Sequence, residues 1–194
     1  MAKILYIREV NNALLLLALD EEGECVRYTV SRSLYSEIGA PVKGCELLDG
    51  EADKIKRFDE IYRAKKKALS LLSYSDKSES VLKQRLFAAG FSKESAEKAS
   101  FEMVKLGYIN EEGQLTKLIL NEANLKLRGP MKIIPYLRAK GYLSEDIKRV
   151  MHALVESGEV DFKKNAKKLL EKHRLSESDV EDKKIILYKN GYKI

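Results

Sequence analysis

A short motif occurs three times in the chain at nearly constant spacing, and this repeat restricts the fold more than any other feature. The motif reads Leu-x-x-x-Gly-aromatic, and its glycines, Gly90, Gly141 and Gly191, are 51 and 50 residues apart. Twelve residues before each glycine stands a residue type that often begins helices, namely Ser78, Gly129 and Asp179. Each motif therefore predicts the end of a helix, with glycine in the left-handed terminal position and the aromatic ring folded back onto the core.

The same register continues beyond the motif. Gly107 and Gly158 each follow a motif glycine by 17 residues. The intervening apolar positions recur at i, i+3, i+4, i+7 and i+8, which is one face of an amphipathic helix; they are Ala96, Ala99, Ser100, Met103 and Val104, matched by Ile147, Val150, Met151, Leu154 and Val155. Ser92 and Ser144 are candidate caps of these helices, with Leu143 as a one-residue insertion. Leading helices are expected over residues 60–73, 114–127 and 162–173.

These periods predict a mostly α-helical protein of tandem three-helix repeats, preceded by a small β-rich N-terminal domain. The expected divisions are a head over residues 1–53 and repeats over 54–110, 111–160 and 161–194, the third truncated to two helices. Pro135 is expected to interrupt the middle helix of the second repeat and to kink it, because proline lacks a backbone donor.

The first fifty residues have the pattern of a β-meander. Three short strands are expected over residues 4–10, 13–19 and 25–30, separated by the turn signals Asn11-Asn12 and Asp20 to Gly23. Ser31 is then expected to cap one short helix that ends near Ile38, with Gly39 as its stop.

The net charge of +6 is unevenly distributed. Residues 1–53 hold five basic and ten acidic residues, a balance of −5, whereas residues 54–194 hold 31 basic and 20 acidic residues, a balance of +11. The basic body is expected to contact a polyanion or an acidic protein surface, with ordinary solubility charge as the alternative. Aromatic residues interleaved with the basic ones are sparse, which argues against a dedicated platform for single-stranded nucleic acid.

Catalytic and metal-binding signatures are missing from the sequence. The glycines from Gly39 to Gly44 have P-loop spacing, but Cys45 stands where lysine must follow. His152 and His173 make no zinc-ligand pattern with the two cysteines, Cys25 and Cys45. We therefore expect no enzyme activity, no cofactor and no metal. No signal peptide or membrane span is visible, so a reducing cytoplasm is the expected location.

Three segments resemble the RecX family of regulators of the RecA recombinase. The run from Ala68 through Leu-Ser-Tyr to Ser78-Glu, the motif Leu86…Gly90-Phe91-Ser92 and the turn Leu106-Gly-Tyr-Ile-Asn-Glu are similar to the most typical part of RecX sequences. Residues 126–129 followed by 137–141 resemble the signature of the second RecX repeat.

The resemblance implies a non-enzymatic modulator that binds the RecA–DNA filament and limits its growth, recombination and coprotease activity. It also implies weak, sequence-independent contact with single- or double-stranded DNA, no membrane association and action as a monomer. Charge and repeat position predict the residues that face filament or DNA: Arg63, Lys66, Lys83, Arg85, Arg128, Lys132, Arg138 and Lys140. A stand-alone DNA-binding helical module and a structural adaptor that docks a partner on its incomplete third repeat remain alternatives.

Overall fold

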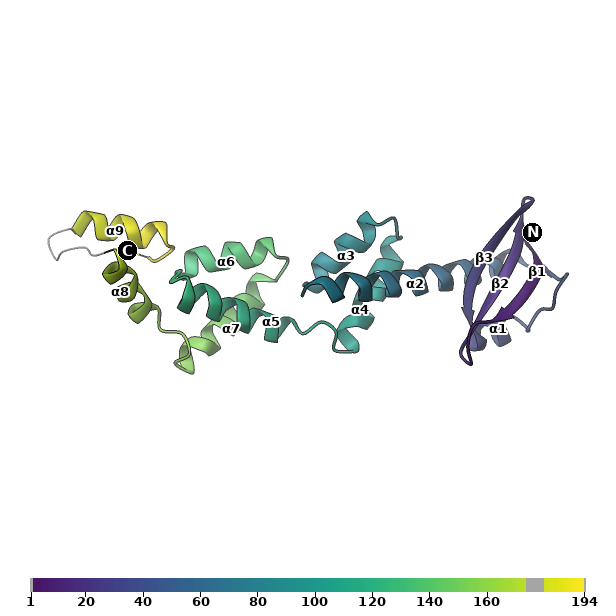
Figure 1. Cartoon of the computed structure of the whole chain (residues 1–194), viewed down its shortest axis with the longest axis horizontal. Helices are drawn as coiled ribbons and strands as arrows, with labels where there is room; N and C mark the ends of the chain where they lie inside the picture. The colour runs from purple at the N-terminus through teal and green to yellow at the C-terminus, as the bar shows by residue number, and fades with distance from the viewer. Residues whose placement is uncertain (1, 174–179, 194) are drawn as a thin grey trace. The chain divides into compact units, whose positions relative to one another are not determined.

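The computed structural model describes residues 2–173 and 180–193. The chain divides into two compact units. The first unit comprises Met1–Tyr74 and Lys83–Lys105, and the second comprises Ser75–Leu82 and Leu106–Ile194. The fold is mostly helical with a small N-terminal sheet, as the repeat and the meander pattern predicted (Figure 1).

The first unit begins with an antiparallel sheet in the order β3-β2-β1-β4. The expected meander forms its first three strands, β1 (Ala2–Glu9), β2 (Leu14–Glu21) and β3 (Glu24–Ser31). A short helix, α1 (Arg32–Glu37), follows, and the Ser31 hydroxyl caps it by accepting from the Leu34 amide, as predicted. The two-residue strand β4 (Glu46–Leu47) pairs with β1 and was not predicted, because two residues are too few to produce a periodic signal.

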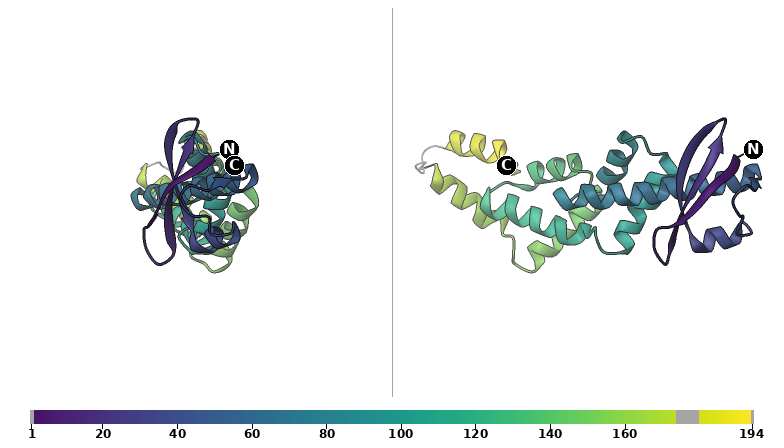
Figure 2. Two further views of the ribbon diagram at one scale, coloured as in Figure 1. Left: turned by 90° about the vertical axis from the view of Figure 1, so that its right-hand side faces the viewer. Right: turned by 45° about the vertical axis from the view of Figure 1, so that its right-hand side comes forward.

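The helix α2 (Asp49–Tyr74) begins well before the expected start at residue 60. Ala52 and Ile55 belong to the apolar core of the sheet, so the early turns pack on the head and are stabilised by that contact. The helix then extends away from the sheet (Figures 1 and 2). The expected head boundary after residue 53 thus lies inside α2, and the four-part division of the chain stays a prediction.

Two further helices, α3 (Glu79–Ala88) and α4 (Lys93–Lys105), follow, and α4 packs along α2. Both predicted caps are confirmed. The Ser78 hydroxyl accepts from the Val81 amide, and the Ser92 hydroxyl accepts from the Ser95 amide, each at 3.3 Å.

The second unit encloses its own apolar core, built around Leu115, Ile133 and Leu137. Its elements are α5 (Glu111–Leu120), the π-helical segment η1 (Asn121–Leu125), α6 (Pro130–Ala139), α7 (Ser144–Glu156), α8 (Phe162–Lys172) and α9 (Val180–Lys189). The expected helix over residues 114–127 is therefore α5 continued by a π-helical turn, whereas α8 closely matches its expected range.

All three motifs end a helix in the same way. Gly90, Gly141 and Gly191 have φ values of +91°, +86° and +85°, the left-handed region that glycine adopts without steric cost. The aromatic amide then donates to the carbonyl of the motif leucine, at 3.3 Å for Tyr142 and 3.0 Å for Tyr192. Both tyrosines are buried, which confirms the predicted role of the aromatic residue in the second and third motifs, whereas Phe91 of the first motif is only half-buried. Asp179, the expected cap of the third motif helix, lies outside the described residues.

The motif end of one repeat packs on the start of the motif helix in the preceding repeat. The Ser78 hydroxyl donates to the Lys140 carbonyl at 2.9 Å. In the same register, the Gly129 amide donates to the Asn190 carbonyl at 2.8 Å. This contact recurs because equivalent positions of successive repeats meet, and both instances lie within the second unit.

Two local predictions in the second repeat are wrong. The N-cap of α7 is Leu143, with Ser144 inside the helix, because Leu143 stands two residues after Gly141 as Ser92 does after Gly90. The expected insertion is therefore absent. The expected interruption at Pro135 is also not observed, since α6 continues through it to Ala139.

The predicted amphipathic faces of α4 and α7 are confirmed at four of their five positions. Ala96, Ala99, Ser100 and Met103 are buried in α4, and their counterparts are buried in α7. The fifth position is exposed in both helices, with Val104 at 37% and Val155 at 44%.

Candidate functional site

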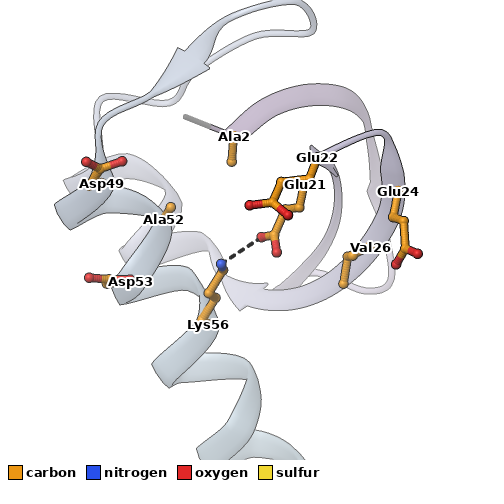
Figure 3. A pocket seen from close by; sticks show the side chains of 9 residues that line it. All are labelled: Ala2, Glu21, Glu22, Glu24, Val26, Asp49, Ala52, Asp53 and Lys56. Atoms are coloured by element: carbon orange, nitrogen blue, oxygen red, sulfur yellow. Dashed lines mark ion pairs between the residues drawn. The ribbon is translucent and has the colours of Figure 1, made fainter.

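The acidic head contains a hollow of about 620 Å³ beside the first turns of α2 (Figure 3). An ion pair of 3.0 Å between Lys56 and Glu21 crosses it. Its other charged lining residues are all acidic: Glu22, Glu24, Asp49 and Asp53. A polyanion would be repelled from this hollow, so we place the candidate site elsewhere.

The strongest run of positive charge lies in the second unit. From residue 123 to residue 144 the chain has no Asp or Glu, and its charged residues are Lys126, Arg128, Lys132, Arg138 and Lys140. This run covers the loop before α6, the whole of α6 and the residue after it. A positive potential is therefore concentrated on a single helix and its N-terminal loop.

Three of these cations gather around one aromatic ring. The Lys140 Nζ lies 5.2 Å from the centroid of the Tyr136 ring, and the Lys126 Nζ and the Arg128 Cζ each lie 5.9 Å from it. These distances are within the range of cation–π attraction. We call Lys126, Arg128, Tyr136 and Lys140 the Tyr136 cluster.

A buried carboxylate orients two cations of the cluster. Glu122 is fully buried and forms ion pairs with the Lys126 Nζ, at 2.6 Å, and with the Arg128 Nη1. Both basic side chains keep part of their surface in water, with 45% and 34% exposed. Because one negative charge neutralises only one of three positive charges, the cluster keeps a net charge of about +2 and is held in place before any ligand arrives.

The backbone that carries Lys126 and Arg128 is unusual. The π-helical segment η1 ends at Leu125, and Leu127 has a φ of +53°, a left-handed conformation that leucine rarely adopts. The Arg128 amide donates to the Glu122 carbonyl at 2.9 Å, which closes a wide turn. The wide turn brings Arg128 back over Glu122 and next to the ring of Tyr136.

Helical spacing divides the other two basic residues of α6. Lys132 and Lys140 stand four residues before and after Tyr136, so all three lie along one side of the helix. Arg138 is two residues from Tyr136 and therefore points to a different side. Both Lys132 and Arg138 are exposed, but only Lys132 extends the Tyr136 cluster.

Two of the four remaining predicted residues, Arg63 and Lys66, have local partners. The Arg63 Nε donates to a carboxylate oxygen of the buried Asp59 at 2.7 Å, and the Lys66 Nζ lies 5.8 Å from the ring centroid of Tyr62. Lys83 is half-buried and Arg85 is exposed, both on α3. The first unit holds these four residues and the second holds the other four. A continuous basic surface over all repeats therefore stays a prediction.

Sequence reasoning missed Glu122 and Tyr136 and left Lys126 out of the predicted set. The available signals were short: Glu122 and Lys126 are at i, i+4 spacing, and so are Tyr136 and Lys140. Neither spacing indicates that the Glu122–Lys126 pair lies next to the Tyr136–Lys140 pair, because the turn at Leu127 separates the two pairs in sequence.

Over residues 2–173 and 180–193, no helix is long and apolar enough to cross a membrane. In the same part of the chain, no three His, Cys, Asp or Glu side chains gather as metal ligands would.

Comparison with known proteins gives two kinds of match. Residues 64–99 match the family model of the RecX first three-helix domain. A crystal structure of the regulatory protein RecX is 24% identical with a TM-score of 0.69, covering 100% of this chain and 95% of that one. The crystal structure of RecX from Lactobacillus salivarius is 18% identical with a TM-score of 0.57, covering 70% and 90% of the two chains. No curated protein sequence matches significantly.

Proposed function

We propose that this chain, whose residues 64–99 match the RecX first three-helix domain and whose fold is similar to that of RecX, is a RecX-type regulator that modulates the RecA recombinase by binding the RecA–DNA filament. It acts without catalysis or a cofactor, and it limits filament growth, recombination and the coprotease activity of RecA. The observation that carries the proposal is the RecX match over residues 64–99, in a chain whose fold is that of RecX along its whole length.

The charge distribution supports binding to a filament that contains DNA. Phosphate contacts supply affinity that does not depend on base sequence, and exposed Lys and Arg side chains make many of them. The Tyr136 cluster meets this requirement with a net charge of about +2 on a rigid helix and its preceding loop. We include in the contact surface all eight residues predicted from charge and repeat position.

The test is a titration into RecA assembled on single-stranded DNA, with ATP hydrolysis as the report of filament integrity. We expect hydrolysis to fall at less than one molecule of this protein per RecA. If hydrolysis is unchanged at saturating protein, the proposed modulation of RecA is wrong.

The design of the variants follows from the ion pairs. Arg63 and Arg128 neutralise the buried carboxylates of Asp59 and Glu122, so reversing their charge would unfold the protein locally rather than test the surface. Charge reversal is therefore restricted to four exposed residues: Lys66, Arg85, Lys132 and Lys140.

A matched control reverses four exposed lysines outside the predicted surface: Lys43, Lys93, Lys105 and Lys148. We expect the surface variant to lose inhibition of RecA and the control to keep it. Equal loss in both variants would mean that net charge alone, rather than this surface, determines inhibition.

A stand-alone DNA-binding module is the second candidate, favoured by the net positive charge and the aromatic ring of the Tyr136 cluster. High affinity for duplex DNA in the absence of RecA, dependent on base sequence and steep in salt, would favour this function over the first.

A further inference from the structure

Residues 190–192, which follow α9, hold the loop that carries two cations of the Tyr136 cluster. The Tyr192 hydroxyl donates to the Leu127 carbonyl at 3.0 Å. The Gly129 amide donates to the Asn190 carbonyl at 2.8 Å. The loop from residue 126 to residue 129 is thus fixed at two points by a segment about sixty residues further along the chain.

The conformation of that loop depends on these contacts. Leu127 is left-handed, and a non-glycine residue keeps such a conformation only where its surroundings impose it. Lys126 and Arg128 stand on either side of Leu127, so their side chains change direction if its backbone relaxes. Tyr192 is therefore a positioning residue for the cluster, because it holds the peptide between the two cations.

We propose that the Tyr136 cluster binds the phosphodiester backbone of a nucleic acid, and that docking of residues 190–192 sets the affinity. This proposal rests on the proposed function and deepens it by naming the site that holds the DNA. The planar guanidinium of Arg128 matches phosphate oxygens, and the two lysines add point charges.

The ring of Tyr136 favours a nucleic acid over an acidic protein. Aromatic rings combined with cations are the groups that single-stranded sites use, because a ring stacks on a sugar or a base next to a bound phosphate. A carboxylate of an acidic protein would contact the cations of the cluster but would have no use for the aromatic ring. A single ring serves one nucleotide, so the site positions a strand without reading its sequence.

Thermodynamic linkage gives this arrangement a second consequence. If docking of residues 190–192 strengthens binding of the nucleic acid, binding must strengthen docking by the same factor. Docking can be followed through the amides of Gly129 and Met131, which donate to the carbonyls of Asn190 and Gly191. Their hydrogen exchange should slow when the site is occupied.

The first experiment measures binding of fluorescent oligo(dT) to the full chain at several salt concentrations. Lys126→Ala leaves the buried Glu122 paired with Arg128, so the loop keeps its ion pair. This variant should weaken binding and reduce the salt slope by about one, as loss of one phosphate contact does. Tyr192→Phe should weaken binding about two- to tenfold, the range that one net hydrogen bond supplies, with an unchanged salt slope. Tyr188→Phe, a change of the same type at an exposed position of α9, is the matched control and should bind like the wild type.

The second experiment measures exchange of the Gly129 and Met131 amides by NMR, with and without oligo(dT). We expect oligo(dT) to slow their exchange in the wild type and Tyr192→Phe to accelerate it. Faster exchange in Tyr192→Phe with wild-type affinity for DNA would overturn the proposed coupling. Wild-type affinity in Lys126→Ala would overturn the assignment of the site.

A competition with polyglutamate separates the two classes of polyanion. The opposing outcome is that polyglutamate binds as tightly as oligo(dT) and that Lys126→Ala reduces the affinity for both polyanions by the same factor. In that case the cluster is a site for acidic proteins and the assignment to nucleic acid is wrong. The protein could give the expected result in each of these binding experiments and still leave ATP hydrolysis by RecA unchanged. That outcome would refute the proposed function and support only this inference.

Discussion

Replacing Gly129 by alanine should disrupt the contact between the second and third repeats. A Cβ atom at this position would lie 2.2 Å from the Gly191 carbonyl oxygen and 2.7 Å from the Tyr192 amide nitrogen. Both obstacles are backbone atoms, which cannot rotate away as a side chain does. Gly129 itself has an ordinary φ of −83°, so the expected effect of Gly129→Ala is steric and not a matter of backbone strain.

The magnitude follows from the displacement that the new Cβ requires. Because Cβ atoms are essentially never found within 3.0 Å of such atoms, the Gly191 carbonyl would move by about 0.8 Å. A movement of that size would lengthen the bond from the Gly129 amide to the Asn190 carbonyl from 2.8 Å to about 3.6 Å, which is no longer a hydrogen bond. Together with the bonds made by Met131 and Tyr192, three hydrogen bonds are at risk, a loss of about 2–4 kcal/mol in the free energy of unfolding.

The assay is urea denaturation followed by circular dichroism, with hydrogen exchange of the Met131 amide as the local readout. Gly50→Ala is the matched control, because Gly50 lies in α2 with nothing within 4 Å of its Cβ position and should tolerate alanine without loss. If Gly129→Ala unfolds within about 0.5 kcal/mol of the wild type and the Met131 amide exchanges at the wild-type rate, the steric argument is refuted.

Three further predictions concern buried polar groups. Ser78→Ala removes both the cap of α3 and the bond to the Lys140 carbonyl, so urea denaturation should show a loss of about 1–2 kcal/mol. Asp59→Ala removes the acceptor, at 2.8 Å, of the Thr29 amide on an edge strand; amide exchange at Thr29 should accelerate, and unchanged exchange would contradict this role. Burial raises the pKa of Tyr142 from 10.0 to about 12, so the neutral phenol is favoured in the folded state. The contribution of the Tyr142 phenol to the free energy of unfolding is therefore fully present below pH 10 and is lost as the pH rises towards 12. In Tyr142→Phe, the free energy of unfolding should depend less on pH in that range.

The local structure of the repeats could be predicted from sequence because few neighbouring residues decide it. Glycine at the motif position permits a positive φ, and serine twelve residues earlier supplies an oxygen to a free amide, whatever surrounds them. Gly90 and Ser78 were therefore correctly predicted from sequence. Ser144 was not, because a cap was assigned from residue type when the register of the motif pointed to Leu143.

The early start of α2 could not be predicted in the same way. Its first turns have no strong amphipathic pattern of their own, and Ala52 and Ile55 are buried only because the sheet lies against them. The strand β4 is a similar case, since Glu46 and Leu47 become a strand by pairing with β1. Contacts between segments distant in sequence decide both elements.

For this protein, the sequence by itself determined the period, the helix ends, the acidic head and the positively charged body, since each depends on residue type and spacing alone. Only the tertiary structure decided which charges meet. Glu122, Tyr136 and Tyr192 come together because a π-helical turn, a left-handed leucine and a crossing of two glycine backbones bring distant segments within hydrogen-bond distance. Such meetings depend on the packed geometry of the whole unit, and no local pattern in the chain encodes them.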